Sequence, residues 1–318
     1  MDRSEGEFRN ELYLQGMDRK DFIRTGLLGT GVFVTGAAAL GATSNGIDEL
    51  TGLRPLAMPP DVVGFNHLPA DLDEAGDHYV VHRAATRGHA NRGWLDTHHT
   101  FSFSSYYNPE RMHFGALRVI NDDAIAGGRG FGTHPHDNME IVTIPLEGDL
   151  RHRDSMGNTS VIAHGDVQVM SAGTGITHSE FNANPDRDVK LLQIWMFPKR
   201  RSVEPRYGQI SLDTRDRHNR FQQILSPSPD DEGVWVHQDA WFHMGRFDRG
   251  RRSDYAIRRP GNGVYAFVVA GSFRFTDTAL DLTLETRDGL GIWNVASLHC
   301  EALTDGAELL LMDVPMVL

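Results

Sequence analysis

Thiol chemistry is almost absent from this sequence, which has one cysteine, Cys300, among its 318 residues. A single cysteine excludes an intramolecular disulfide and any zinc or iron–sulfur site built on several thiolates. Cys300 lies late in a strand-like run beside His299. We interpret it as a small buried residue rather than a nucleophile, since free cysteines are mostly buried and inert. A metal ion bound by this chain must therefore be held by nitrogen and oxygen atoms.

Positive charge is also scarce. The chain has 31 Lys and Arg residues against 43 Asp and Glu residues, a formal net charge of -12. Such a surface repels phosphate backbones, so nucleic acid is not an expected partner. Apolar residues make up 40% and charged residues 23%, the balance of a folded globular protein. The length is sufficient for two ordinary domains.

The N-terminal 42 residues resemble an extension and an export signal rather than part of a folded domain. After Met17, basic Arg19 and Lys20 precede a Gly/Ala-rich apolar stretch, with small residues for cleavage at 37–42. The basic head resembles a twin-arginine signal in which Lys20 replaces the second arginine. The apolar stretch is short and rich in glycine, which favours cleavage over a stable membrane span. We therefore expect a periplasmic or otherwise exported protein; without export it would be cytoplasmic.

Residues 43–78 are expected to form a linker, because they contain several prolines and no core-forming pattern. From Tyr79 onward, helical periodicity gives way to short runs of Val, Ile, Leu, Phe and Trp, interrupted by Gly, Asp or Asn. These runs lie at 115–120, 141–145, 167–170, 190–197, 264–269, 289–293 and 309–314. Many short strands at this spacing predict an all-β, antiparallel architecture such as the jelly roll.

The strand pattern occurs twice. IVTIPLEGDL (141–150) precedes HGDVQVMSAG (164–173), and YAFVVAGSFRF (265–275) precedes RDGLGIWNVAS (287–297). Each half has a strand that ends in glycine, a return strand, and a turn of glycine and an acidic residue into a further strand. A tandem duplication of one barrel explains this repetition. We expect a first domain at 79–205 and a second domain at 206–318.

Two pairs of candidate metal ligands lie in the first half. His134 and His136 are two residues apart, so on a β-strand both side chains leave the same face. His178 and Glu180 have the same spacing. Three imidazole nitrogens and one carboxylate suit Fe(II), Mn, Ni, Cu or Zn. Four protein ligands leave room on a five- or six-coordinate ion for water or substrate, as in reactive metal sites.

The motifs around these residues resemble those of the pirin family. GFGTHPHDNME (130–140) and SAGTGITHSEF (171–181) match the two cupin motifs in the version that pirins carry. The resemblance extends from Tyr79 to about the C-terminus, and further matching segments are RGHANRGWLDTHHTFSF (87–103), FGALRVINDD (114–123), RDSMGN (153–158) and PRYGQ (205–209). It implies two tandem cupin (jelly-roll) barrels. One metal ion, usually iron, is implied in the first barrel on His134, His136, His178 and Glu180, and no metal site in the second.

The resemblance also implies a reaction. Several bacterial pirin-like proteins are described as quercetin 2,3-dioxygenases, which open a flavonol ring with O₂ and release carbon monoxide. We therefore expect a metal-dependent dioxygenase that acts on a flavonol-like small molecule, with Fe(II) as the expected metal. Glu180 would accept the proton of the substrate's 3-hydroxyl. Phe131, Glu140, His152 and Asp154 are candidate neighbours of the pocket.

Two other functions are compatible with the same motifs. The first is a non-catalytic iron-binding or redox-sensing protein, since eukaryotic pirins act as iron-dependent partners of transcription regulators. An export signal argues against that role. The second is another cupin enzyme with a different substrate, because the cupin fold hosts many reactions.

Overall fold

The computed structural model describes residues 78–276 and 280–318. The expected signal peptide, and all but the last residue of the expected linker, lie outside the described residues. In the described ranges the chain consists of β-strands and two short 3-10 helices, η2 (Ala84–Thr86) and η3 (Thr214–Arg217), with no α-helix. No helix in this part of the chain has the length and apolar character needed to cross a membrane.

The described chain contains twenty-two strands. The first twelve are β1 (Tyr79–His82), β2 (Gly88–Asn91), β3 (Leu95–His99), β4 (Leu117–Ile125), β5 (Gly130–His136), β6 (Glu140–Glu147), β7 (Leu150–Asp154), β8 (Thr159–Ile162), β9 (Asp166–Ser171), β10 (Ile176–Asn182), β11 (Val189–Met196) and β12 (Arg206–Ser211). They are followed by β13 (Phe221–Ser226), β14 (Val234–Trp235), β15 (Trp241–Phe247), β16 (Arg252–Ala256), β17 (Asn262–Ala270), β18 (Ser272–Thr276), β19 (Asp281–Glu285), β20 (Gly289–Ile292), β21 (Ser297–Ala302) and β22 (Ala307–Pro315).

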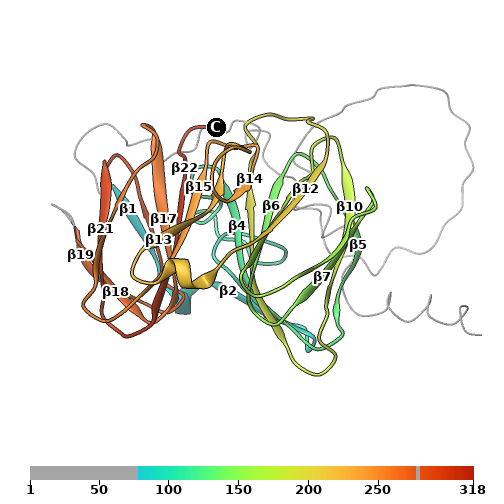
Figure 1. Cartoon of the computed structure of the whole chain (residues 1–318), viewed down its shortest axis with the longest axis horizontal. Helices are drawn as coiled ribbons and strands as arrows, with labels where there is room; N and C mark the ends of the chain where they lie inside the picture. The colour runs from blue at the N-terminus through green and yellow to red at the C-terminus, as the bar shows by residue number, and fades with distance from the viewer. Residues whose placement is uncertain (1–77, 277–279) are drawn as a thin grey trace, which may run out of the picture.

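Four sheets build two barrels that lie side by side (Figure 1). The N-terminal barrel combines the seven-stranded sheet β12-β9-β6-β11-β4-β3-β2 with the four-stranded sheet β5-β10-β7-β8. The C-terminal barrel combines the seven-stranded sheet β1-β20-β17-β22-β15-β13-β14 with the four-stranded sheet β16-β21-β18-β19. The all-β fold of two tandem cupin barrels expected from the sequence is confirmed.

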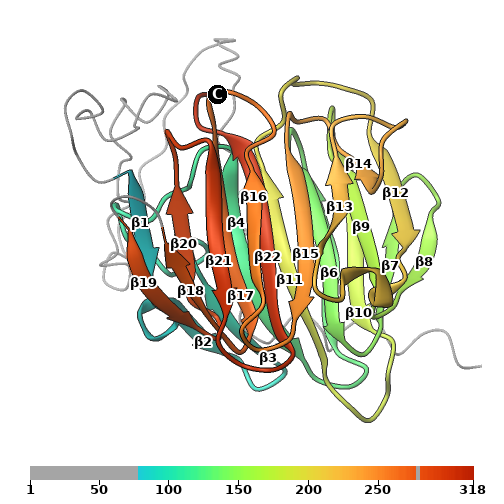
Figure 2. The ribbon, with the colours of Figure 1, turned by 60° about the vertical axis from the view of Figure 1, so that its left-hand side comes forward.

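The two barrels exchange strands at their edges. β1, at the start of the described chain, pairs with β20 of the C-terminal barrel, and β12 pairs with β9 of the N-terminal barrel (Figure 2). The division expected from the sequence at 205/206 assigns each of these strands to the other barrel. Hydrophobic periodicity identifies a strand but not the sheet edge that it joins, and hydrogen bonds across that edge decide the outcome.

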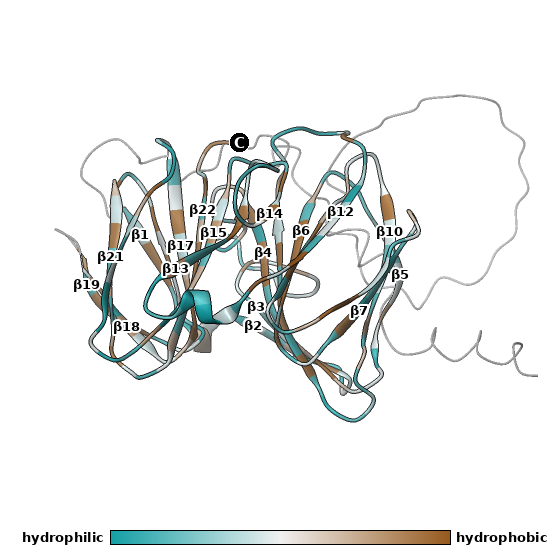
Figure 3. Cartoon of the chain, in the orientation of Figure 1, coloured by the Kyte–Doolittle hydropathy of each residue, from teal (hydrophilic) through white to brown (hydrophobic). Residues whose placement is uncertain are grey.

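The large sheets of the two barrels pack against each other through one apolar cluster. In β11, Leu192 and Ile194 belong to this cluster, whereas Leu191 and Trp195 point into the N-terminal barrel. Tyr265 and other residues of the C-terminal sheet complete the cluster from the opposite side. Both faces of these strands are therefore buried. Figure 3 shows apolar segments, in brown, on strands of both barrels.

Both barrels bury apolar and polar side chains. The C-terminal interior contains an apolar cluster that includes Phe273, Phe275, Leu298 and Cys300. Cys300 is buried as expected, and burial raises the pKa of its thiol to about 12. Buried polar side chains of the C-terminal strands include Gln223, His243 and Asp313, and those of the N-terminal strands include Thr97, Asn121, Asp123, His152, His178 and Glu180. The N-terminal set contains the predicted ligands His178 and Glu180.

Candidate metal centre

Three of the predicted ligands meet on the strand pair β5–β10. His134 and His136 leave β5 on one side, and His178 of β10 stands directly opposite His134 in the antiparallel register. One ligand nitrogen from each ring lies within 4.8 Å of the other two. The ring centroids are 4.3 Å apart for His134 and His178, and 4.9 Å apart for His136 and His178. The structure thus brings together the three imidazoles that the sequence spacing selects.

The hydrogen bonds of the rings leave nitrogens that can coordinate a metal ion. His134 Nδ1 lies 2.7 Å from the carbonyl oxygen of Gly132, to which it can donate, so its Nε2 carries the lone pair. His178 Nδ1 lies 3.0 Å from Nε2 of His152. Nε2 of His178 is buried and has no hydrogen-bond partner among the described residues. A buried polar atom without a partner is costly, and a metal ion would satisfy it.

The imidazoles are also in the charge state that coordination requires. Burial lowers the pKa of His134, and it lowers the pKa values of His136 and His178 well below the usual range for histidine. Neighbouring imidazoles lower the last two further. Neutral rings at neutral pH are the form that binds metal ions, so the donor set fits a divalent transition metal.

Glu180 lies in the same pocket but outside the group of three histidines. It shares the inner face of β10 with His178, and the register with β5 shifts between the two residues, so Glu180 stands opposite Phe131. Nε2 of Gln193 donates to both carboxylate oxygens, at 3.0 and 3.2 Å. Burial and, to a smaller extent, the neighbouring Asp123 together raise the pKa of Glu180 to about 7, against the lowering effect of the hydrogen bonds from Gln193. The carboxylate is therefore poised to exchange a proton near neutral pH.

A pocket opens onto these groups from the interior of the barrel. The space between its walls is about 550 Å³, which includes space open to solvent. Its walls are Ala90, Arg92, Leu95, Thr97, His99, Phe103, Ser104, Asn121, Asp123, Phe131, His134, His136, Glu180, Gln193 and Trp195. Trp195 packs edge-on against the ring of His136, with centroids 4.9 Å apart. The pocket thus joins aromatic walls to a small set of polar groups.

The other candidate neighbours have different positions. Phe131 lines the pocket, and His152 lies behind His178 as described above. Asp154 organises the turn after β7, where its carboxylate accepts hydrogen bonds from Met156 N and from Asn158.

Glu140, a candidate neighbour of the pocket, is not among the residues that line it. Its Oε2 accepts hydrogen bonds from the hydroxyl of Ser171 at 2.8 Å and from His237 N of the C-terminal barrel at 3.2 Å. Glu140 begins β6 and alternates with Ile141, whose side chain points into the barrel. Its carboxylate consequently lies on the side that faces the second barrel.

Several residues of the pocket were not predicted from the sequence. Asn121, Asp123 and Gln193 are polar residues at inward positions of strands that are otherwise apolar, and His99 and Asn121 are joined by a hydrogen bond of 2.8 Å. The sequence contained one indication of such a residue, because the polar Gln193 interrupts the otherwise apolar run LLQIW. Whether the Gln193 side chain points into the barrel depends on which face of the strand lines the interior, and the structure is needed to show this.

Comparison with known proteins places this site in a family. The Pirin family model matches residues 80–196, and a model described as the quercetinase C-terminal cupin domain matches residues 223–314. A quercetin 2,3-dioxygenase of Escherichia coli K12 is 44% identical over 237 residues, which are 74% of this chain and 99% of that protein. The chain belongs to the pirin family.

Other pirins support the same assignment. A pirin-like protein of Caulobacter vibrioides is 40% identical over 227 residues, covering 71% of this chain and 95% of that protein. The crystal structure of the bacterial pirin YhhW from Escherichia coli in complex with nickel(II) has a TM-score of 0.70 and 42% identity, covering 75% of this chain and 100% of that one. The family predicted from the cupin motifs is confirmed.

Proposed function

We propose that this pirin is a metal-dependent dioxygenase that opens flavonols or related enols with O₂. The observation that carries the proposal is the group of three neighbouring imidazoles, two of which line an aromatic-walled pocket together with the buried carboxylate of Glu180. The name of the Escherichia coli relative, quercetin 2,3-dioxygenase, supports this reaction class.

His134, His136 and His178 would hold one divalent metal ion, with Glu180 as the fourth ligand and Fe(II) as the metal. Imidazole and carboxylate donors suit Fe(II), and the nickel(II) complex of YhhW supports a divalent ion in a pirin. The bound metal would supply Lewis acidity and reactivity toward O₂. His152 would orient His178 by accepting a hydrogen bond from its Nδ1.

The chain's own residues would bind and deprotonate the substrate. Glu180, which lines the same pocket, would accept the proton of the substrate's enol hydroxyl. Gln193 would hold the carboxylate in place through its two hydrogen bonds. Phe103, Phe131 and Trp195 would contact the flat faces of the substrate and exclude water.

Metal analysis and gas measurements on the purified protein test the proposal. We expect one Fe(II) per chain at this site, uptake of O₂ with quercetin, and release of carbon monoxide. His178→Ala should lose the bound iron and the O₂ uptake, whereas the exposed-site control His164→Ala should keep both. Bound iron without O₂ uptake across a set of flavonols would refute the dioxygenase, and full iron retention in His178→Ala would refute the ligand set.

A further inference from the structure

A second group of histidine and aspartate side chains lies on the outer face of β2 and β3, behind the pocket. Residues of β3 alternate, so Thr97 and His99 line the pocket while Asp96 and His98 point outward. His89 of β2 stands directly opposite His98 in the antiparallel register. Two imidazoles and one carboxylate therefore lie on the same outer face of the β2–β3 hairpin.

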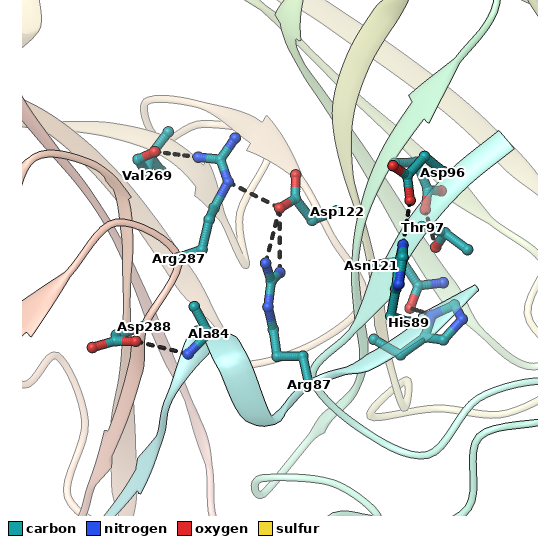
Figure 4. A network of polar contacts seen from close by, with 12 residues as sticks. Ala84, Arg87, His89, Asp96, Thr97, Asn121, Asp122, Val269, Arg287 and Asp288 are labelled. Atoms are coloured by element: carbon teal, nitrogen blue, oxygen red, sulfur yellow. Dashed lines mark hydrogen bonds and ion pairs between the residues drawn. The ribbon is translucent and has the colours of Figure 1, made fainter. Parts of the chain in front are cut away.

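These three side chains are already close together. His89 Nε2 lies 2.6 Å from Asp96 Oδ1, as Figure 4 shows, and the rings of His89 and His98 stack with centroids 4.3 Å apart. One ligand atom from each of the three residues lies within 4.8 Å of the others. Ligand atoms around a tetrahedral ion with bonds of about 2.1 Å are about 3.4 Å apart, so small side-chain rotations would close the site.

We propose that His89, Asp96 and His98 form a second metal site, which takes a divalent ion of borderline softness such as Zn(II). Two imidazoles and one carboxylate are a recurring donor set for such ions, and water would complete the coordination. Entry is open from solvent, because the side chains of His89 and Asp96 are 51% and 45% exposed. The ion would replace the proton that joins His89 Nε2 to Asp96 Oδ1.

An ordinary surface ion pair is the competing explanation, and the chain contains two such pairs for comparison. His218 pairs with Asp248 at 3.1 Å, and His299 pairs with Asp254 at 2.7 Å, both on the exterior. Neither belongs to a group of three candidate ligands within the described residues. The β2–β3 group differs from these pairs because it contains a second imidazole, that of His98.

The guanidinium of Arg87, which lies nearby, belongs to a separate polar network. It donates hydrogen bonds at 3.2 and 3.3 Å to Asp122, which also accepts one from Arg287 at 2.9 Å. The hairpin that carries the group also forms one wall of the pocket through Ala90 and Leu95. An ion bound behind this wall would link β2 to β3 and stabilise the hairpin independently of the ion proposed inside the barrel.

Zinc binding by the full chain, measured by equilibrium dialysis and metal analysis after chelator treatment, tests the second site. At micromolar free Zn(II) we expect two ions per wild-type chain and one in His98→Ala. We likewise expect one in His178→Ala, which removes the site inside the barrel, and none in the double variant. Asp96→Asn, which changes the side-chain volume little, should also lose the second ion. His299→Ala, which removes the imidazole of an ordinary surface pair, should still bind two.

Two outcomes overturn this proposal. One is a His98→Ala chain that folds and still binds two zinc ions; the other is a wild-type chain whose single ion is lost only in His178→Ala. Thermal unfolding of each variant shows whether it has folded. Because the readout is metal content, an absence of dioxygenase activity leaves the result unaffected.

Discussion

Asp122→Ala should destabilise the protein strongly, because Asp122 neutralises two arginines that come from both barrels. Its Oδ2 accepts hydrogen bonds from Arg87, which directly precedes β2, at 3.2 and 3.3 Å and from Nε of Arg287, in the turn before β20, at 2.9 Å (Figure 4). The side chains of Arg87 and Asp122 are only 5% and 15% exposed. Arg287 also donates to the carbonyl oxygen of Val269, and its φ of 70° lies in the left-handed region.

The magnitude follows from what the substitution leaves behind. Without Asp122, two guanidinium groups remain near each other with little access to water, and breaking a buried ion pair in this way costs about 3–5 kcal/mol. Partial exposure of Arg287 places the expected loss near the lower end, about 3 kcal/mol. The exposed pair Arg274–Asp281, with an N–O distance of 2.6 Å, is the matched control. Asp281→Ala should cost much less than Asp122→Ala, because solvent screens an exposed ion pair.

Urea unfolding followed by fluorescence and circular dichroism measures both losses. A triple variant, Arg87→Met with Asp122→Leu and Arg287→Met, should recover most of the stability, because apolar groups of similar volume often replace buried ions without loss. If Asp122→Ala costs no more than Asp281→Ala, the network makes no net contribution and the reasoning fails.

Three further predictions concern other parts of the chain. Burial lowers the pKa of His82 to about 4, so its neutral form stabilises the folded state above pH 6.5, and this contribution is lost as the pH falls toward 4. The wild-type protein should therefore lose more unfolding free energy between pH 7 and pH 4.5 than His82→Gln does, by about 2–3 kcal/mol. Urea unfolding at each pH measures this difference. Equal losses in the two proteins would contradict the lowered pKa of His82. Gln193→Leu should lower kcat for quercetin by about 10–100-fold, because Glu180 loses both hydrogen bonds from the Gln193 amide. A kcat equal to that of the wild type would show that Gln193 does not position Glu180. We further propose that residues 17–42 direct twin-arginine export. In cell fractionation, the double variant Arg19→Gln with Lys20→Gln should keep the precursor in the cytoplasm, and undiminished export of this variant would refute the proposal.

The fold and the histidines of the centre could be predicted because they depend on local rules. Alternation with a period of two determines which residues of a strand share a face, and the HPH segment therefore presents His134 and His136 together. Short apolar runs separated by turn residues predicted two β barrels for the same reason. Both inferences require only the phase of one strand.

The details that could not be predicted depend on contacts between distant segments. The edge positions of β1 and β12 depend on hydrogen bonds to strands that are up to about two hundred residues away in the chain. Glu140 has the sequence spacing of a pocket residue, but the phase of β6 directs its carboxylate to the second barrel. The hydrogen bonds between Gln193 and Glu180 arise only when β10 and β11 are placed in different sheets of the same barrel.

The C-terminal barrel contains a test of the motif logic within the same chain. β21 occupies in its four-stranded sheet the position that β10 occupies in the other, and it contains His299 and Glu301 at the same two-residue spacing as His178 and Glu180. In β21, however, the inward positions are held by Leu298 and Cys300, which belong to the apolar core of that barrel.

The His-x-Glu pair of β21 therefore points away from the barrel interior. His299 pairs with Asp254 at 2.7 Å, and Glu301 pairs with Arg252 at 2.9 Å. A shift of one residue in strand phase exchanges the buried face for the exposed one. The H-x-E spacing is thus insufficient to make a ligand pair: its phase must also place both side chains in an interior that has partners for them.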